Sequence, residues 1–216
     1  ALPLLDRLTQ GDETSREAML AMMGQANLQV GDVSKAIDFF REGSAAFPDN
    51  PLFELGLALT LLAEGRPDEA LQLLRQVPDG AADATREAFV TIAWMQKGDV
   101  DTAVDSARSL VRRHPEEAWS HNLLGSVLTA AGEFTEARQV LEKAIALDPN
   151  DSTTLANLAR VEQLLGNPDA AAEAWRGILA RDPANADAGF ALARLELDRG
   201  NTPAALAVLE PLQKGS

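Results

Sequence analysis

The chain has 216 residues, a formal net charge of −14 at neutral pH and no cysteine. The lack of cysteine excludes disulfides, cysteine-ligated zinc and thiol chemistry. The acidic charge argues against nucleic acid and anionic membranes as partners, because phosphate groups require a basic surface. Apolar residues make up 46% of the chain but aromatic residues only 5%, which predicts a core of leucine and alanine.

Glycine, alanine and proline recur along the chain at nearly constant intervals. Successive glycines of the series are 34, 33, 34, 34 and 34 residues apart, and alanines five residues further on keep the same spacing. A period of this length predicts a stack of helix pairs, each called here a repeat with an A helix followed by a B helix. The glycines are Gly31, Gly65, Gly98, Gly132, Gly166 and Gly200, and prolines follow in phase at Pro48, Pro115, Pro149 and Pro183.

The period divides the whole chain into consecutive segments. The first segment has apolar residues in the phase of a B helix, and the last has no further helix to cap it. In chain order they are 1–16, the B helix of a preceding repeat, then the repeats 17–50, 51–83, 84–117, 118–151, 152–185 and 186–216.

The repeat 118–151 shows the pattern most clearly. We predict an A helix over Ala118–Ala131, which Gly132 ends because glycine readily adopts the left-handed conformation. A B helix over Phe134–Leu147 should end at the Asp148-Pro149 turn, because proline cannot continue a helix. Asp151 or Ser152 can then cap the next A helix.

The repeat resembles the tetratricopeptide repeat. The matching positions are His121, Leu124-Gly125, Leu128, Ala137, Leu141, Ala144 and Pro149. The resemblance covers the whole chain and implies an all-α, right-handed superhelical solenoid of about six tandem helix-turn-helix repeats. It departs from the family pattern at Gly43 and Ile178, where alanine is usual, at Thr91, where glycine or alanine is usual, and in the short 78–83 turn.

The resemblance also implies that the A helices line a concave groove in which a protein or peptide segment binds. Positions 2, 5, 9 and 12 of each repeat should face that groove. The groove is expected to be apolar in its N-terminal part, polar around a tryptophan in the middle, and to carry arginines towards the C-terminus. The candidate partner-binding residues are Leu52, Leu55, Leu59, Leu62, Ile92, Met95, Trp119, Asn122, Asn157, Arg160, Phe190 and Arg194.

Two of these features leave alternatives open. Arg160 and Arg194 stand out on an acidic chain and could bind a carboxylate or phosphate, or could instead pair with Glu162 and Glu196. The segment 51–62 is apolar almost all round, which is typical of a helix buried on every side. A partner, another part of the protein, a second copy or a tightly closed superhelix could cover it.

Nothing in the sequence indicates a catalytic site, a cofactor or a metal. There are two histidines, and His121 is expected to be packed and hydrogen-bonded because no metal-ligating side chains lie in phase with it. The catalytic and phosphate-binding motifs of common enzymes are missing. Trp94 and Trp175 are expected in the core, and Trp119 faces either the groove or the next A helix.

The stretch 105–212 further resembles the large PrsT-type bacterial tetratricopeptide lipoproteins that accompany PEP-CTERM protein sorting and exopolysaccharide gene clusters. It contains His121-Asn122-Leu123-Leu124-Gly125, and Asp148-Pro149-Asn150 after an apolar helix end. This resemblance implies an envelope-anchored, periplasm-facing scaffold, with a cytoplasmic location as the alternative. Because the chain starts inside a helical pattern, we expect it to be part of a longer protein, and no apolar run is long enough to insert into a membrane.

The sequence therefore predicts a non-catalytic scaffold that binds a partner segment in its groove. Two alternatives remain. The apolar part of the groove could join two copies of the chain into a homo-oligomer, or the array could recruit substrates for a larger enzyme.

Overall fold

The computed structural model describes residues 13–78, 80 and 82–213, and all regular secondary structure in these residues is α-helical. The predicted all-α class is therefore confirmed. Of the B helix expected over 1–16, residues 1–12 lie outside the described part, and α2 already begins at Glu13. The helices are α2 (Glu13–Gln29), α3 (Val33–Ala46), α4 (Pro51–Ala63), α5 (Pro67–Leu74), α6 (Asp83–Lys97), α7 (Val100–Arg113), α8 (Ala118–Ala131), α9 (Phe134–Leu147), α10 (Ser152–Leu164), α11 (Pro168–Arg181), α12 (Ala186–Asp198) and α13 (Thr202–Gln213).

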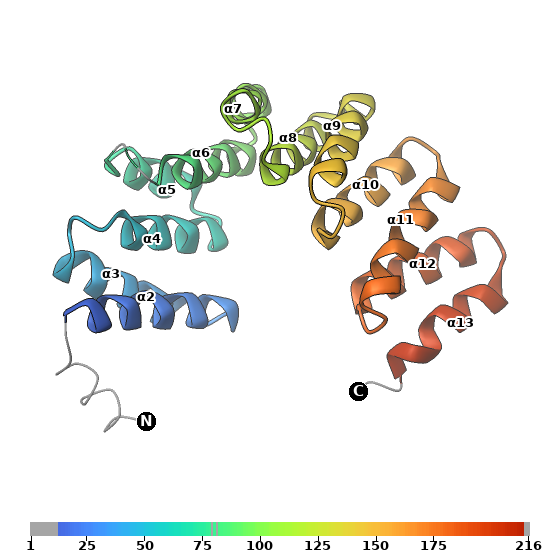
Figure 1. The fold of residues 1–216 in the computed structure, drawn as a ribbon, viewed down its shortest axis with the longest axis horizontal. Helices are drawn as coiled ribbons and strands as arrows, with labels where there is room; N and C mark the ends of the chain where they lie inside the picture. The colour runs from blue at the N-terminus through green and yellow to red at the C-terminus, as the bar shows by residue number, and fades with distance from the viewer. Residues whose placement is uncertain (1–12, 79, 81, 214–216) are drawn as a thin grey trace. The chain divides into compact units, whose positions relative to one another are not determined.

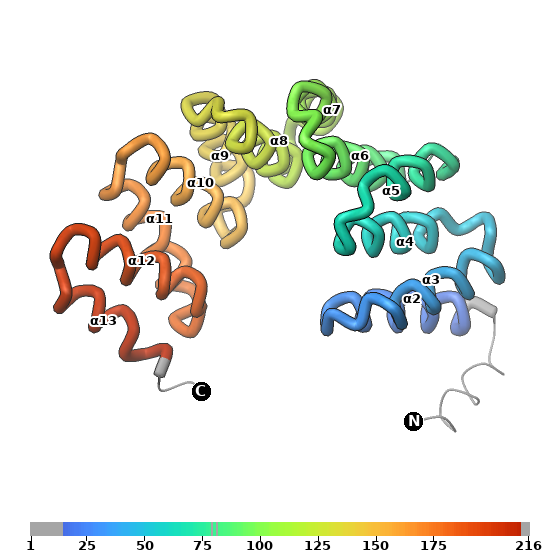
Figure 2. Tube along the Cα trace, turned by 180° about the vertical axis from the view of Figure 1, so that it is seen from behind, coloured from blue at the N-terminus to red at the C-terminus, as the bar shows by residue number. Residues whose placement is uncertain are grey.

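The chain divides into two compact halves, one ending at Ser106 and the other beginning at Ala107, so the division falls inside α7. In the N-terminal half, α2 to α6 follow one another as neighbours (Figure 1), and α4 also contacts α2 and α6 directly. In the C-terminal half, α8 to α13 are joined in the same way, and α10 also contacts α8. Figure 2 shows the same succession of neighbouring helices within each half from behind. A helices thus lie against A helices, as the repeat requires.

The ends of the helices follow the predicted local chemistry. Gly132 ends α8 in the left-handed conformation with φ +79°, and Asp151 caps α10 by accepting hydrogen bonds from the backbone N–H groups of Thr153 and Thr154. Asn50 caps α4 in the same way through the N–H of Leu52. The predicted bounds of α8 and α9 are confirmed to the residue.

Small residues allow the two helices of a repeat to approach closely. A Cβ atom on Gly125 of α8 would lie 2.5 Å from Cγ of Leu141 on α9, and Leu141 is fully buried. Ala137 and Ala144 of α9 are also fully buried. The leucine-and-alanine core predicted from composition therefore forms where the helix axes come together.

The departures from the family pattern have local causes. The Phe53 ring occupies the space beside Gly43, so that a Cβ there would lie 2.1 Å from the ring. Thr91 is fully buried, and its Oγ1 lies 2.9 Å from the Glu87 carbonyl and 2.6 Å from the Ser106 hydroxyl. The hydroxyl is thus satisfied inside the core, as a buried polar group must be.

The B helix that precedes the predicted 78–83 turn is shortened. Helix α5 has 8 residues, whereas α3, α9 and α11 each have 14. Pro78 disfavours helical geometry at Val77 and supplies no N–H group, which opposes continuation of α5 into the turn.

Candidate functional site

The A helices of the N-terminal half form an apolar groove. Its walls come from α2, α4 and α6 together with Phe40 of the B helix α3, and it encloses about 210 Å³. Helix α4 contributes the most lining residues and is apolar over most of its surface: Phe53 and Ala58 are fully buried, while Leu52 and Leu59 are exposed. The apolar groove is defined by Ala21, Leu28, Leu52, Leu55, Leu59 and Phe89.

The structure separates the predicted apolar residues into two sets. Leu52 is 57% exposed and Leu59 is 36% exposed, so both present side chains to a partner. Leu55 and Leu62 are each only 3% exposed. Leu55 still borders the groove, but Leu62 packs in the core cluster that includes Ala70, Leu71 and Ala93.

Leu62 therefore does not face the groove as expected. Ile92 and Met95 are half-buried and lie outside the groove walls. Sequence reasoning missed Phe89, which lines the groove from α6. Phe89 directly follows Ala88, which was expected to face the groove, and this neighbouring position could have indicated that Phe89 lines it.

Polar side chains of the C-terminal half are linked across two A helices. The Asn157 amide on α10 donates to Oδ1 of Asn122 at 2.8 Å and to the Ser126 hydroxyl at 3.1 Å, both on α8. Arg160 donates to Oδ1 of Asn157 at 3.4 Å. Trp119 is partly exposed, with its ring centre 5.4 Å from that of His114.

The two predicted arginines do not pair with the glutamates expected for them. Glu162 accepts a hydrogen bond from Asn167 at 2.8 Å. Glu196 is buried and accepts from Arg176 at 2.6 Å, with Arg199 3.6 Å away.

Both arginine side chains consequently remain available. Arg160 donates one hydrogen bond, to Asn157, and neither arginine makes an ion pair with any residue that the structure describes. Both are exposed. The alternative in which neighbouring glutamates neutralise them is wrong.

Two adjoining hollows share these arginines. One, of about 660 Å³, is bordered by Leu164 and Asp198 as well, and the other, of about 530 Å³, by Asp187 and Phe190. Phe190 is 61% exposed. We call this region of α10 and α12 the arginine surface, which comprises Arg160, Gln163, Leu164, Asp187, Phe190, Arg194 and Asp198.

The remaining aromatic predictions are mostly confirmed. His121 is buried, and its Nε2 lies 2.8 Å from the Pro115 carbonyl, which ties the preceding turn to α8. Trp175 is buried in the core of the C-terminal half. Trp94 is only half-buried and has the Lys97 ammonium 4.9 Å from its ring centre.

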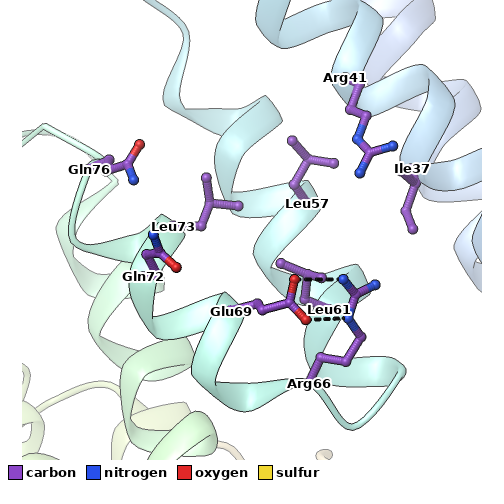
Figure 3. A pocket seen from close by; sticks show the side chains of 9 residues that line it. All are labelled: Ile37, Arg41, Leu57, Leu61, Arg66, Glu69, Gln72, Leu73 and Gln76. Carbon is purple, nitrogen blue, oxygen red and sulfur yellow. Dashed lines mark hydrogen bonds and ion pairs between the residues drawn. The ribbon is translucent and has the colours of Figure 1, made fainter.

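Another hollow, of about 290 Å³, lies where α4 meets the B helices α3 and α5 (Figure 3). Its side chains include Leu57 and Leu61, with Arg66 and Glu69 facing each other across hydrogen bonds of 2.7 Å. The hydrogen bond from Arg66 lowers the pKa of the Glu69 carboxyl. Because Glu64 also binds Arg66, that charge is already neutralised, and we place the candidate site on the A helices.

Within residues 13–78, 80 and 82–213, no cluster of three or more histidine and carboxylate side chains is arranged to hold a metal ion. The same residues contain no helix that is both long and apolar enough to span a membrane. The described surface offers exposed apolar side chains and two arginines without ion pairs on A helices, an arrangement suited to binding a partner.

Family comparison identifies the repeat over most of the chain. One model described as "Tetratricopeptide repeat" matches residues 27–88 and 163–214, and two others with the same description match 93–152 and 140–173.

Among curated proteins, the chain is 28% identical over 235 residues to cellulose synthase operon protein C of Pseudomonas fluorescens, covering 97% of this chain and 18% of that protein. It is 39% identical over 180 residues to cellulose synthase 1 operon protein C of Komagataeibacter xylinus, covering 75% of this chain and 14% of that protein. It also resembles BBSome complex member bbs-4 of Caenorhabditis elegans, at 25% identity over 71% of this chain and 35% of that protein. The chain thus spans only a minor part of these relatives.

Solved structures share the fold. A thermophilic tetratricopeptide-repeat protein of Thermus thermophilus matches with a TM-score of 0.75 and 21% identity, over 84% of this chain and 99% of that one. The Cut9 and Hcn1 hetero-tetramer of the APC/C matches with a TM-score of 0.73 and 21% identity, over 91% of this chain and 39% of that one. These similarities establish the helix-pair array.

Proposed function

Since the chain belongs to the tetratricopeptide-repeat family, we propose that this protein-interaction scaffold is non-catalytic and holds a partner protein segment against the exposed faces of its A helices. The observation that carries the proposal is the exposed apolar side chains of Leu52 and Leu59 beside the groove between α2, α4 and α6. Such side chains on an otherwise acidic surface mark an interaction site.

The apolar groove suits a short apolar side chain or two rather than a whole small molecule. Its volume of about 210 Å³ is below the range of about 300–1,000 Å³ that is common for small-molecule sites. A peptide side chain anchored there would bury Leu52 and Leu59, while the main chain runs on across neighbouring A helices.

We further propose that the scaffold serves a bacterial exopolysaccharide or envelope system. The support is similarity to cellulose synthase operon protein C of two bacteria, although this chain corresponds to less than a fifth of each. The partner would then be another protein of that system, and protein sorting at the envelope is the narrower version of the same idea.

The test is capture of partners from the source cells by crosslinking, with wild type and a Leu52→Asp/Leu59→Asp variant as baits. Leu55 and Leu62 are left unchanged, because a charge at either buried position would disrupt the core. Val30→Asp/Leu206→Asp is the matched control, since both residues are exposed and apolar but lie outside the groove walls.

The proposal expects a protein that wild type and the control capture and the groove variant loses. Recovery of the same proteins by all three baits would contradict it. Recovery of the bait alone would instead point to self-association of the scaffold.

A further inference from the structure

We infer that the arginine surface on α10 and α12 selects an acidic partner segment, one that carries carboxylate side chains interspersed with apolar ones. This inference rests on the proposed function and names the chemistry of the segment. It concerns side-chain carboxylates within the segment rather than the end of a chain.

The first step is that neither arginine makes an ion pair with a described residue. Glu162 and Glu196, each two residues further along the same helix, already satisfy other groups. Asp198 lies one turn beyond Arg194 and borders the same hollow, but forms no ion pair with it. Glu196 is buried against Arg176, with Arg199 also close, and therefore cannot turn outward to Arg194. An exposed guanidinium that makes no ion pair can donate charge-assisted hydrogen bonds to an incoming carboxylate.

The second step is that Arg160 is held in position. It donates a hydrogen bond of 3.4 Å to Asn157, and the Asn157 amide itself donates to Asn122 and Ser126 on the neighbouring α8. Asn157 is therefore a positioning residue, which reduces the conformational entropy that Arg160 loses when it binds.

The third step concerns the apolar surroundings. Leu164, Phe190 and Leu197 are each more than half exposed on the same two helices. A free anion would leave these side chains in water, whereas an amphipathic segment would cover them while its carboxylates meet the arginines. Trp175 borders the hollow beside Phe190, and its buried indole Nε1 has no hydrogen-bond partner, which adds an unused donor behind the surface.

The fourth step is electrostatic. Asp187 and Asp198 also border the two hollows. The two aspartates offset the formal charge of the two arginines, so a ligand gains only where each of its negative groups lies closer to a guanidinium than to these carboxylates. The local balance therefore favours carboxylates spaced along a peptide, one for each arginine.

The test measures fluorescence polarisation of a labelled peptide, acetylated and amidated at its ends, in which glutamates are separated by leucines. A second peptide has glutamine in place of every glutamate. Wild type should bind the glutamate peptide at least about tenfold more tightly, since hydrogen bonds to charged groups contribute about 1.5–3 kcal/mol and tenfold corresponds to about 1.4 kcal/mol. Arg160→Gln and Arg194→Gln should each weaken the affinity for the glutamate peptide by about tenfold.

Arg181→Gln is the matched control, because Arg181 is also exposed but lies at the end of α11 outside both hollows. Asn157→Ala should weaken binding of the glutamate peptide while leaving the weak binding of the glutamine peptide unchanged. Circular dichroism of every variant checks that the helices are retained.

The inference is overturned if wild type binds both peptides equally or neither peptide, or if Arg181→Gln loses as much affinity as Arg160→Gln. In each of those cases, capture of a cellular partner through Leu52 and Leu59 would still support the proposed scaffold function. If no captured protein were lost with the Leu52→Asp/Leu59→Asp variant, that result would count against the proposed function without bearing on the choice between the two peptides.

Discussion

Alanine at position 43 should destabilise the protein, although alanine is both the residue usual in the family and the better helix former. A Cβ atom there would lie 2.1 Å from two carbons of the Phe53 ring. The ring is fully buried and stacks on Phe47 with ring centres 6.1 Å apart, so it has little room to retreat.

The expected magnitude comes from two opposing terms. Overpacking a buried site costs about 1–3 kcal/mol, and the severity of this contact places Gly43→Ala at the upper end. Replacing glycine by alanine inside a helix contributes about 1 kcal/mol in the other direction. We expect a net loss of about 2 kcal/mol in the free energy of unfolding.

Gly177→Ala in α11 is the matched control. The nearest atom to a Cβ at Gly177 is Cδ1 of Leu155 at 4.0 Å, an ordinary van der Waals contact. Only the difference in helix propensity then applies, and the free energy of unfolding of this variant should rise by about 1 kcal/mol.

The assay is urea unfolding followed by circular dichroism, with native-state hydrogen exchange to show that the loss is in α3 and α4, because repeat arrays need not unfold in one step. Phe53→Leu should lessen the cost of Gly43→Ala when the two are combined, and the double-mutant cycle measures that coupling. If Gly43→Ala raised stability as much as Gly177→Ala, the assigned role of the Phe53 ring would be refuted.

Two further predictions follow from burial and capping. Leu62→Asp should lower the free energy of unfolding by at least about 4 kcal/mol, because it buries a charge in the core. Leu52→Asp, at an exposed site, should change it by less than about 1 kcal/mol. Equal effects of the two substitutions in urea unfolding would contradict the assigned burial. Asp151→Ala should cost about 1 kcal/mol at neutral pH through loss of the α10 cap. Burial raises the pKa of Asp151, but hydrogen bonds from Thr154 and Thr153 outweigh it and lower the folded-state pKa below 3.8. The charge-dependent part of the difference from wild type is therefore fully present above that value and is lost as the pH falls through the lower folded pKa. The protonated carboxyl still accepts hydrogen bonds through its carbonyl oxygen, as neutral caps do, so a smaller difference should remain in strong acid; a difference of the same size at neutral pH and in strong acid would argue against a charge-assisted cap.

The helices were predictable because their boundaries depend on neighbouring residues. Gly132 and the Asp148-Pro149 turn mark the ends of α8 and α9 whatever surrounds them. The close approach at Gly125 was also predictable from the repeat, because a small residue at a fixed position of the period allows two helix axes to come together there.

The site was less predictable because it depends on contacts between helices. Helix α4 is apolar almost all round, so its periodicity cannot separate the exposed Leu52 from the buried Leu62. The partners of Glu196 could not be inferred either, because Arg176 lies twenty residues away and reaches it only when α11 packs against α12. Because Glu196 is occupied by that cross-helix pair, it does not pair with Arg194.

The central claim, that the A-helix faces are the working surface, is tested most directly by site-specific photo-crosslinking in the source cells. A photoreactive residue is placed singly at the exposed A-helix positions Leu52, Leu59 and Phe190, and for comparison at the exposed B-helix positions Asp38 and Lys143. The account predicts that a partner protein is trapped from the A-helix positions alone. Equal trapping from Asp38 and Lys143, or trapping from those positions only, would contradict it and transfer the function to the B-helix face.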